Sequence, residues 1–203
     1  KYIFHLNKDP ELLKIFITKD MLLLCFERGF LDIIKFIMTK KDIFTLLDVN
    51  LLFQRSCRYG QLPTIKYILD LFPKLDISAD NERAFQFACK KGNLKTIEYL
   101  LSIKPDIDIS ANNEYAFKLA CKKGHLKTIQ YLLAIKPDID INDNCCEALR
   151  LACEYTCYNI VCFLIGLNDS KINCLLDNEF VCEDVLLFAC EENYLDIIKH
   201  VLK

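Results

Sequence analysis

The sequence predicts an all-α protein, a solenoid of about six stacked helix–turn–helix units with short extended fingers between them. A cysteine followed three positions later by glycine recurs every 32 residues, at Cys57, Cys89 and Cys121. Residues 79–110 aligned with residues 111–142 are identical at 24 of 32 positions. A fixed period of this length is typical of supersecondary units that each pack on their neighbours. Prolines keep the same interval, at Pro73, Pro105 and Pro137.

The later of these two segments shows the predicted unit most clearly. Its first helix is expected to begin near Glu114. Phe117, Ala120 and Cys121 then share one helical face, and the two small residues allow a neighbouring helix to approach closely. Gly124 ends this helix, because glycine enters the left-handed region without a side-chain penalty.

A second helix and an extended finger are expected to complete the unit. Lys136-Pro137 ends the helix, because the residue before proline is pushed toward extended geometry. Asp and Ile alternate through residues 138–141, which predicts a short extended arm with both carboxylates in solvent. The inner stripe of the second helix is expected to hold Leu126, Ile129, Leu132 and Leu133, with Lys127, Thr128 and Gln130 outside it.

This arrangement of helix, glycine turn, helix and finger resembles the ankyrin repeat. Residues 115–120 stand in the place of the family's Thr-Pro-Leu-His-x-Ala signature, without its Thr, Pro and His. Gly124-His125-Leu126 and Leu132-Leu133 match the remainder of the family pattern. The finger and first-helix sequences are similar to the divergent ankyrin arrays of amoeba-infecting giant DNA viruses of the mimivirus type. The resemblance implies an ankyrin-type fold and a protein partner held on the concave side.

The repeats are expected to fill residues 21–203, in six units centred near residues 25, 57, 89, 121, 153 and 190. Residues 1–20 are interpreted as a degenerate N-terminal cap or half repeat. From Cys153 to Cys190 is 37 residues, so an insertion is expected within 167–183. Thr156 stands where glycine ends the helix in other units, and we expect its turn to be the least regular of the array.

The sequence shows no constellation for catalysis, so we expect no enzyme and no cofactor. It has no Gly-rich phosphate loop and no metalloprotease or serine-hydrolase motif, and it holds three histidines. His125 falls in the Gly-His turn, where a structural hydrogen bond is expected. Several of the 12 cysteines hold equivalent repeat positions and none lies in a Cys-x-x-Cys knuckle, so no metal site is expected. Cys145 and Cys146 are expected at an exposed finger tip.

Composition also limits the setting and the partners. The net charge of −2 argues against nucleic-acid binding, and no stretch is apolar enough for a membrane span. With no signal peptide visible, we expect reduced thiols in an intracellular, cytoplasmic protein that is not secreted, in the host cytoplasm if viral. The chain begins at Lys1 and ends within a helical pattern, so we expect an excerpt of a longer protein, monomeric as an isolated array.

Charge along the array predicts where a partner binds. Carried over from ankyrin arrays by position, the surface comprises the finger tips and the residues that end each first helix. These pairs are basic in the middle repeats and acidic toward the C-terminus, which would orient a bipolar ligand. The partner-binding candidates are Arg58, Tyr59, Asp80, Lys90, Lys91, Asn112, Tyr115, Lys122, Lys123, Asn144, Glu154, Tyr155, Glu191 and Glu192.

The hypothesis that follows is a non-catalytic scaffold that binds a partner protein through this surface. Its rigid repeats would present the surface with little loss of ordering entropy on association. Two alternatives stay open: an architectural or assembly component, for example of a virus particle, and a targeting subunit of a larger enzyme complex. Self-association through lateral faces would distinguish the architectural role from the scaffold.

Overall fold

The computed structural model describes residues 18–39, 48–137, 139, 141–167, 186–187, 189–191, 193–195 and 198–199. Only the helical backbone is described at 141–146, 153, 165 and 167. The regular elements of these ranges are all α-helices, as predicted. The cap expected at 1–20 and the insertion expected at 167–183 lie outside these ranges, except for residues 18–20 and 167, and stay predictions.

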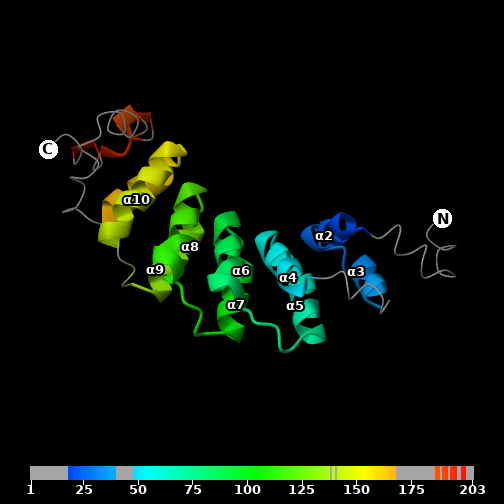
Figure 1. The fold of residues 1–203 in the computed structure, drawn as a ribbon. Coiled ribbons are helices and arrows are strands. Elements are labelled where there is room, and N and C mark those ends of the chain that lie inside the picture. Colours follow the sequence, from blue (N-terminus) through cyan, green and yellow to red (C-terminus); the bar gives the residue numbers. More distant parts are fainter. Residues whose placement is uncertain are drawn as a thin grey trace. The chain divides into compact units, whose positions relative to one another are not determined.

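The described helices follow one another as pairs, one pair per repeat (Figure 1). The pairs are α2 (Lys19–Arg28) and α3 (Leu31–Met38), α4 (Val49–Arg58) and α5 (Leu62–Leu71), α6 (Ala79–Lys91) and α7 (Leu94–Ile103), α8 (Ala111–Lys122) and α9 (Leu126–Ile135), and α10 (Ile141–Glu154) and α11 (Tyr158–Leu167).

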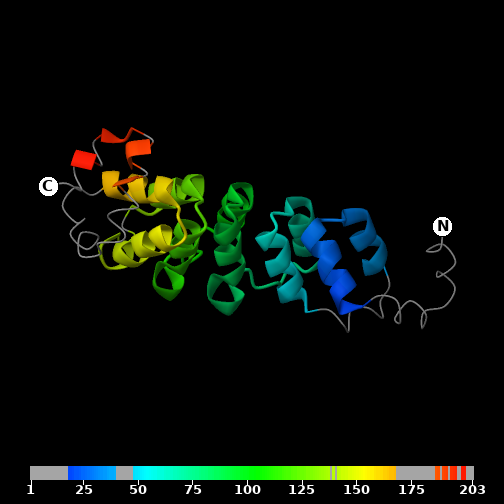
Figure 2. The same cartoon turned by 90° about the horizontal axis from the view of Figure 1, so that it is seen from above.

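The chain divides into two compact units. The first comprises Lys1–Ala88 and Lys95–Pro105, and the second comprises Cys89–Leu94 and Asp106–Lys203. In the first unit, α2 contacts α3 and α4, and α4 contacts α5. In the second, α8 contacts α9 and α10, and α10 contacts α11 (Figure 2). Within each unit, first helices therefore lie side by side, and each second helix packs on its own first helix.

Side chains at equivalent repeat positions fill the core, as the 32-residue period predicts. The phenylalanines and cysteines of the first helices are buried, and so are isoleucines of the second helices. The predicted face of Phe117, Ala120 and Cys121 is thus confirmed. The core positions are Phe53, Phe85, Phe117, Cys57, Cys89, Cys121, Ile65, Ile97 and Ile129.

The buried face of α9 differs from the predicted stripe, because Ile129 and Leu132 are buried whereas Leu126 and Leu133 are half-buried. Thr128, expected outside, is 1% exposed, and Thr64 and Thr96 are equally buried. That expectation is wrong because a helix of a repeat array is covered on more than one face.

The helix-ending turns have the predicted left-handed geometry. Gly124 has φ +73°, its N–H donates to the carbonyl of Cys121 (3.1 Å), and the N–H of His125 donates to the carbonyl of Ala120 (3.0 Å). Thr156 has φ +54°, and the N–H of Cys157 still donates to the carbonyl of Ala152 at 2.8 Å. The turn at Thr156 therefore keeps left-handed geometry with a β-branched residue, and its φ is the smallest among the described turn residues, so the expectation that it is the least regular turn stays a prediction.

The finger at 106–109, which has the same alternating pattern as residues 138–141, is a compact turn rather than an extended arm, whereas Asp138 and Asp140 of the finger predicted at 138–141 lie outside the described residues. The carboxylate of Asp108 accepts a hydrogen bond from the N–H of Ser110 at 3.0 Å, and its carbonyl accepts from the N–H of Ala111 at 3.1 Å. The alternation still separates inside from outside, since Ile107 is buried and Asp108 is exposed. The side-chain–backbone bond of an Asx turn thus replaces the period-two backbone predicted there.

First helices α6 and α8 are entered through a left-handed turn. Asn112, Asn113 and Glu114 have φ between +56° and +57°, so right-handed helix begins after Glu114, close to the predicted start. Glu114 is buried and accepts a hydrogen bond from Ser110 Oγ at 2.6 Å, and Lys136 Nζ lies 3.8 Å from the same carboxylate. These contacts offset the cost of placing a glutamate in the left-handed region.

Side chains that follow the turns connect adjacent repeats. Gln61 Nε2 donates to the carbonyl of Glu27 at 2.9 Å, and His125 Nε2 bonds the carbonyl of Lys90 at 3.0 Å. The structural hydrogen bond expected for His125 is thus confirmed. Each of these side chains, here called staples, crosses the turn glycine of the preceding repeat. A Cβ built on Gly92 would lie 2.6 Å from His125 Nδ1, so glycine is required there for close approach as well as for its positive φ.

Candidate functional site

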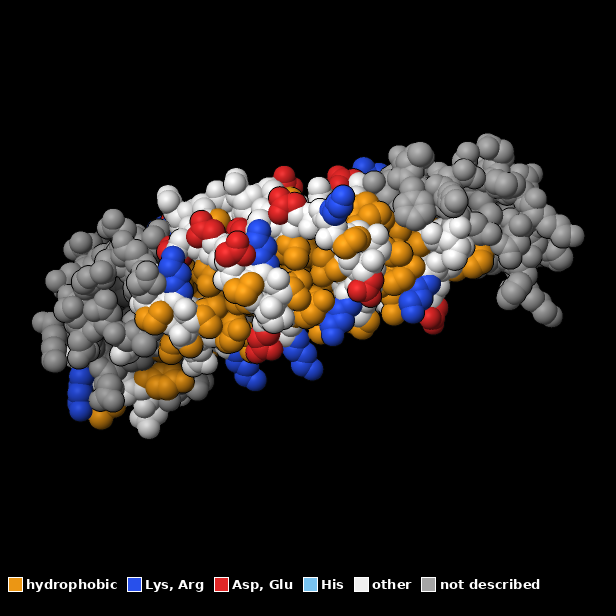
Figure 3. Space-filling model, turned by 90° about the horizontal axis from the view of Figure 1, so that it is seen from below, with side chains coloured by type: hydrophobic (Ala, Val, Ile, Leu, Met, Phe, Trp, Pro, Cys, Tyr) orange, Lys and Arg blue, Asp and Glu red, His pale blue; other side chains and the backbone are white. Residues whose placement is uncertain are grey.

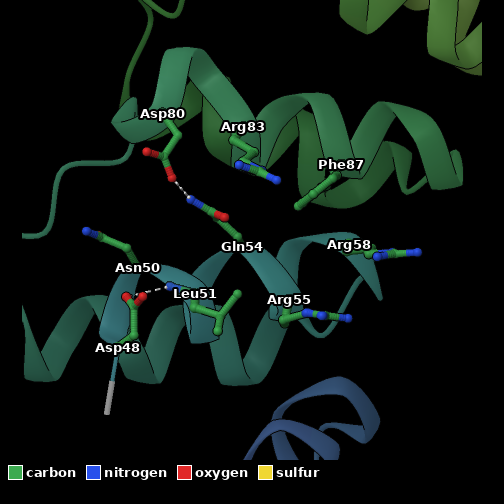
Figure 4. A pocket seen from close by; sticks show the side chains of 9 residues that line it. All are labelled: Asp48, Asn50, Leu51, Gln54, Arg55, Arg58, Asp80, Arg83 and Phe87. Atoms are coloured by element: carbon green, nitrogen blue, oxygen red, sulfur yellow. Dashed lines mark hydrogen bonds between the residues drawn. The ribbon is translucent and has the colours of Figure 1, made fainter.

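Two grooves, one in each unit, lie between neighbouring first helices. The first-unit groove, about 350 Å³, lies between α4 and α6 (Figure 4). It is lined by Asp48, Asn50, Leu51, Gln54, Arg55, Arg58, Asp80, Arg83 and Phe87. The second-unit groove, about 420 Å³, lies between α8 and α10. It is lined by Asn112, Asn113, Tyr115, Lys118, Leu119, Lys122, Glu147 and Leu151.

The two grooves are built from the same repeat positions. Adding twice the 32-residue period carries Gln54 to Lys118 and Arg58 to Lys122. The same shift carries Arg83 to Glu147 and Phe87 to Leu151. The repeat backbone thus provides one kind of recess, and the residues that vary between repeats determine its charge.

Arginines and one aromatic ring dominate one end of the first-unit groove. The guanidinium carbons of Arg58, from α4, and Arg83, from α6, lie 5.5 Å and 5.4 Å from the centre of the Phe87 ring. Both distances are within the range of a cation–π contact. Arg55 Nη1 forms an ion pair with Glu27 Oε1 at 2.9 Å, which holds the Arg55 side chain toward α2.

Carboxylates lie at the other end of this groove, where the helices begin. Asp48 is the N-cap of α4 and accepts a hydrogen bond from the N–H of Leu51 at 3.0 Å. Asp80 Oδ2 accepts from Gln54 Nε2 at 2.8 Å, which joins α6 to α4 (Figure 4). The groove is therefore polarised, with acidic groups at the helix N-termini and basic groups further along.

In the second-unit groove, a buried lysine has an internal partner. Lys118 is buried and its Nζ forms an ion pair with the exposed Glu147. The hydrogen bond from Lys118 lowers the pKa of the Glu147 carboxyl. A lysine on this face would be costly to bury without a partner, so Glu147 neutralises the floor of the groove.

Two further lysines of this unit surround Tyr155. Lys122 Nζ lies 4.3 Å from the centre of the tyrosine ring, and Lys123 Nζ lies 5.1 Å from it. The hydrogen bond with the Tyr155 hydroxyl raises the pKa of Lys122. The ring thus connects the end of one first helix to the end of the next.

Several partner-binding candidates line or border the grooves. Arg58, Asp80, Asn112, Tyr115 and Lys122 are groove residues. The three tyrosine candidates expose large fractions of their surface: Tyr59 40%, Tyr115 45% and Tyr155 44%. Such exposed aromatic rings are typical anchors of protein interfaces.

The other candidates lie outside the groove linings. Lys91 and Lys123 are exposed at the ends of the helices, and the carbonyl of Lys90 accepts the bond from His125. Glu154 forms an ion pair with Arg150, and Glu191 is exposed. Glu192 lies outside the described residues. Asn144, Cys145 and Cys146 lie within α10 rather than at a finger tip, because this helix already begins at Ile141.

Sequence reasoning missed part of each groove. The missed lining residues include Gln54, Arg55, Arg83, Phe87, Lys118 and Glu147. A usable signal was present, since Gln54 and Lys118 lie four positions before Arg58 and Lys122 and so share a helical face with them.

The described side chains form no disulfide and no cluster of metal ligands, and the described helices include none that could cross a membrane. None of the cysteines with described side chains is in a disulfide, and burial raises the pKa of the Cys57 and Cys89 thiols. No group of three or more metal-ligating side chains converges among the described residues. None of the helices that the structure describes combines the length and apolarity needed to cross a membrane.

Comparison with known proteins identifies the repeat type. A family model of ankyrin repeats (3 copies) matches residues 7–113 and 104–178. The chain belongs to the ankyrin repeat family. The crystal structure of the human ASB11 ankyrin repeat domain resembles this ankyrin array with 20% identity and a TM-score of 0.54 over 72% of this chain and 68% of that chain. At this identity the likeness shows the fold alone. No curated protein matches the sequence significantly.

Ankyrin repeats generally mediate protein–protein interactions, and their fold is a typical non-catalytic module. Family membership thus places this array among protein-binding modules. In each unit, the groove between first helices is the candidate surface for such binding, because charged and exposed side chains line or border it.

Proposed function

We propose that this ankyrin array is a non-catalytic scaffold that binds a partner protein across the surface of its first helices. The observation that carries the proposal is the recurrence of one groove at equivalent positions of two units, each bordered by exposed tyrosine and charged side chains. Aromatic and arginine side chains contribute most at interfaces, and a rigid repeat surface loses little entropy on binding.

The test compares two charge-reversed proteins in affinity purification from cell lysate. The groove variant carries Arg58→Glu and Lys122→Glu, one change in each groove. The control carries Lys74→Glu and Lys127→Glu, which alter two exposed lysines outside the groove linings. We expect a partner retained by the wild type and the control and lost by the groove variant, with equal melting temperatures for all three. Equal recovery by both variants would contradict the proposal.

One observation favours an architectural role as the second candidate. The second helices expose an apolar residue at the same position of three repeats, at Leu71, Ile103 and Ile135. Viewed from below, hydrophobic side chains gather between separate charged groups on the described surface (Figure 3). Concentration-dependent self-association that is unaffected by the groove variant would support this role.

The proposal also covers the cellular compartment and the oligomeric state of the array. We place the array in the cytoplasm of a cell, a host cell if its likeness to giant-virus arrays reflects its origin. Buried thiols with raised pKa values and no disulfide among the described cysteines are compatible with a reducing compartment. We propose a monomeric array that acts without nucleic acid or membrane, and a role as targeting subunit of a larger complex fits the same surface.

A further inference from the structure

We infer that the first-unit groove takes an acidic side chain of the partner protein, with its carboxylate held by Arg83 and Arg58 beside the Phe87 ring. This inference rests on the proposed function and specifies the chemistry of one part of that surface. It is carried by three features: the contacts of Arg83, the convergence of two arginines on one ring, and the contrast with the second-unit groove.

Arg83 is the main anion-binding group. Its side chain is exposed, and among the described residues its charged end contacts the Phe87 ring and forms no ion pair with a carboxylate. A guanidinium can contact an aromatic ring and still present N–H donors in its own plane, and these donors form paired hydrogen bonds with a carboxylate.

Arg58 reaches the same ring from the opposite wall of the groove. It belongs to α4, whereas Arg83 and Phe87 belong to α6, and Figure 4 shows the three side chains around the groove. The guanidinium of Arg58 also lies 5.7 Å from the centre of the Tyr59 ring. Aromatic contacts restrict both arginine side chains before binding, which lowers the entropy lost when a carboxylate arrives.

The carboxylates of the groove determine the direction in which a partner segment lies. The carboxylates of Asp48 and Asp80 lie at the helix N-termini, and their negative charge repels a second acidic group at that end. The basic end, at Phe87, attracts it. We therefore expect an acidic residue of the partner near Phe87 and a neutral or basic residue near Asp80.

The second-unit groove is less suited to a carboxylate. Its buried Lys118 is paired with Glu147, and the Lys122 amine lies 4.3 Å from the centre of the Tyr155 ring. Glu147 occupies the repeat position that Arg83 holds in the first unit, so a partner carboxylate there would meet a like charge. Preference for an acidic side chain is thus assigned to the first unit.

The experiment selects peptides from a random display library on the full chain. We expect the selected peptides to be enriched in Asp and Glu. A selected peptide is then synthesised in three forms, with Glu or Asp, with Gln or Asn, or with phosphoserine at the acidic position. Binding of each form is measured by fluorescence anisotropy. The amide should bind roughly tenfold more weakly, as expected for loss of a charge-assisted pair.

Three variants connect this preference to the groove. Arg83→Gln should weaken the acidic peptide roughly tenfold and leave the amide peptide unchanged, while Arg83→Lys should fall between because it keeps charge without the paired hydrogen bonds. Lys95→Gln removes the same charge from an exposed site on α7 and should leave binding within about twofold. Circular dichroism melting shows that each variant is folded.

The outcomes separate this inference from the proposed function. Peptides that bind and are lost with Arg58→Glu and Lys122→Glu, but show no acidic preference, would overturn the inference and leave the groove surface intact. Tighter binding of the phosphoserine peptide than of its carboxylate twin would overturn the choice of a carboxylate. Binding that no groove variant alters would refute both.

Discussion

Replacement of Gly92 by alanine should destabilise the array more than its small size suggests. Gly92 has φ +67°, and an added Cβ would lie 2.6 Å from Nδ1 and 2.7 Å from Cγ of His125. An L-residue in the left-handed region costs about 1–2 kcal/mol. Displacing the His125 ring also breaks its bond to the Lys90 carbonyl, worth about 1 kcal/mol. We expect Gly92→Ala to lower the unfolding free energy by about 2–3 kcal/mol in urea denaturation followed by circular dichroism.

The same substitution at Gly166 is the matched control. Gly166 lies within α11, its φ is not positive, and nothing lies within 4 Å of an added Cβ. Gly166→Ala should therefore stabilise the array by up to about 1 kcal/mol, because alanine is the better helix former. The two alanine variants are expected to shift in opposite directions. A similar shift for both would refute the claim that Gly92 is required for its backbone angle and for the close approach of His125.

A double mutant separates the two causes at Gly92. In His125→Ala the ring is absent, so Gly92→Ala should then cost only the backbone term of about 1–2 kcal/mol. The difference from the cost in wild type measures the coupling between the turn and the staple. Full additivity would show that the ring adapts without loss and that only the positive φ matters.

Three further predictions concern other described contacts. Thr156→Gly should stabilise the array by about 1 kcal/mol in urea denaturation, because φ +54° is unfavourable for a β-branched side chain; a loss of stability would contradict this. Burial lowers the pKa of His125 below 6.5, so the unfolded chain binds more protons near that pH, and stability should fall as pH decreases through about 6.5 toward the folded pKa. Glutamine forms the equivalent staple in the first unit, at Gln61, so His125→Gln should keep the hydrogen bond across the turn. It should also remove the loss of melting temperature on acidification that His125 causes; an unchanged pH profile would exclude His125 as the source of that loss. Glu147→Gln should destabilise the array by leaving the buried Lys118 amine without its counter-charge. In the wild type this ion pair stabilises the folded state above pH 4.5, and the stabilisation is lost as the pH falls through the lowered pKa of Glu147. The variant should lack this pH dependence of the melting temperature, and an unchanged pH profile would contradict this account.

The regular part of the fold was accessible from the sequence because it depends on interactions within one period. The spacing of Phe117, Ala120 and Cys121 is a local helical pattern, and a glycine at position 124 indicates a positive φ there. The Asx turn at Asp108 was missed, because alternating Asp and Ile residues fit a strand with one buried face as well as a turn that buries Ile107. The burial of Thr128 was missed because the helical pattern of one repeat does not show which of its faces other elements cover.

The candidate site was accessible only in part. The helix-end positions of Arg58 and Lys122 follow from the repeat alignment, and both line grooves. The pairing of Lys118 with Glu147, and the meeting of Arg83 with the arginine of the preceding repeat, depend on how two first helices are staggered. No single repeat contains that information, so contacts between repeats determine the charge that each groove presents.

The staples have a consequence for how such a chain can change its length in evolution. Each joins residues about one period apart, 34 for Gln61 and Glu27 and 35 for His125 and Lys90. A tandem duplication of 32 residues, wherever its ends fall, copies one turn glycine and one crossing side chain and recreates their contact at the new junction. Duplication of a length that is not a whole number of periods would displace the glycine from beneath its partner. Recombination in whole periods can therefore lengthen or shorten the array without a new interface, as the 24 identities between 79–110 and 111–142 illustrate.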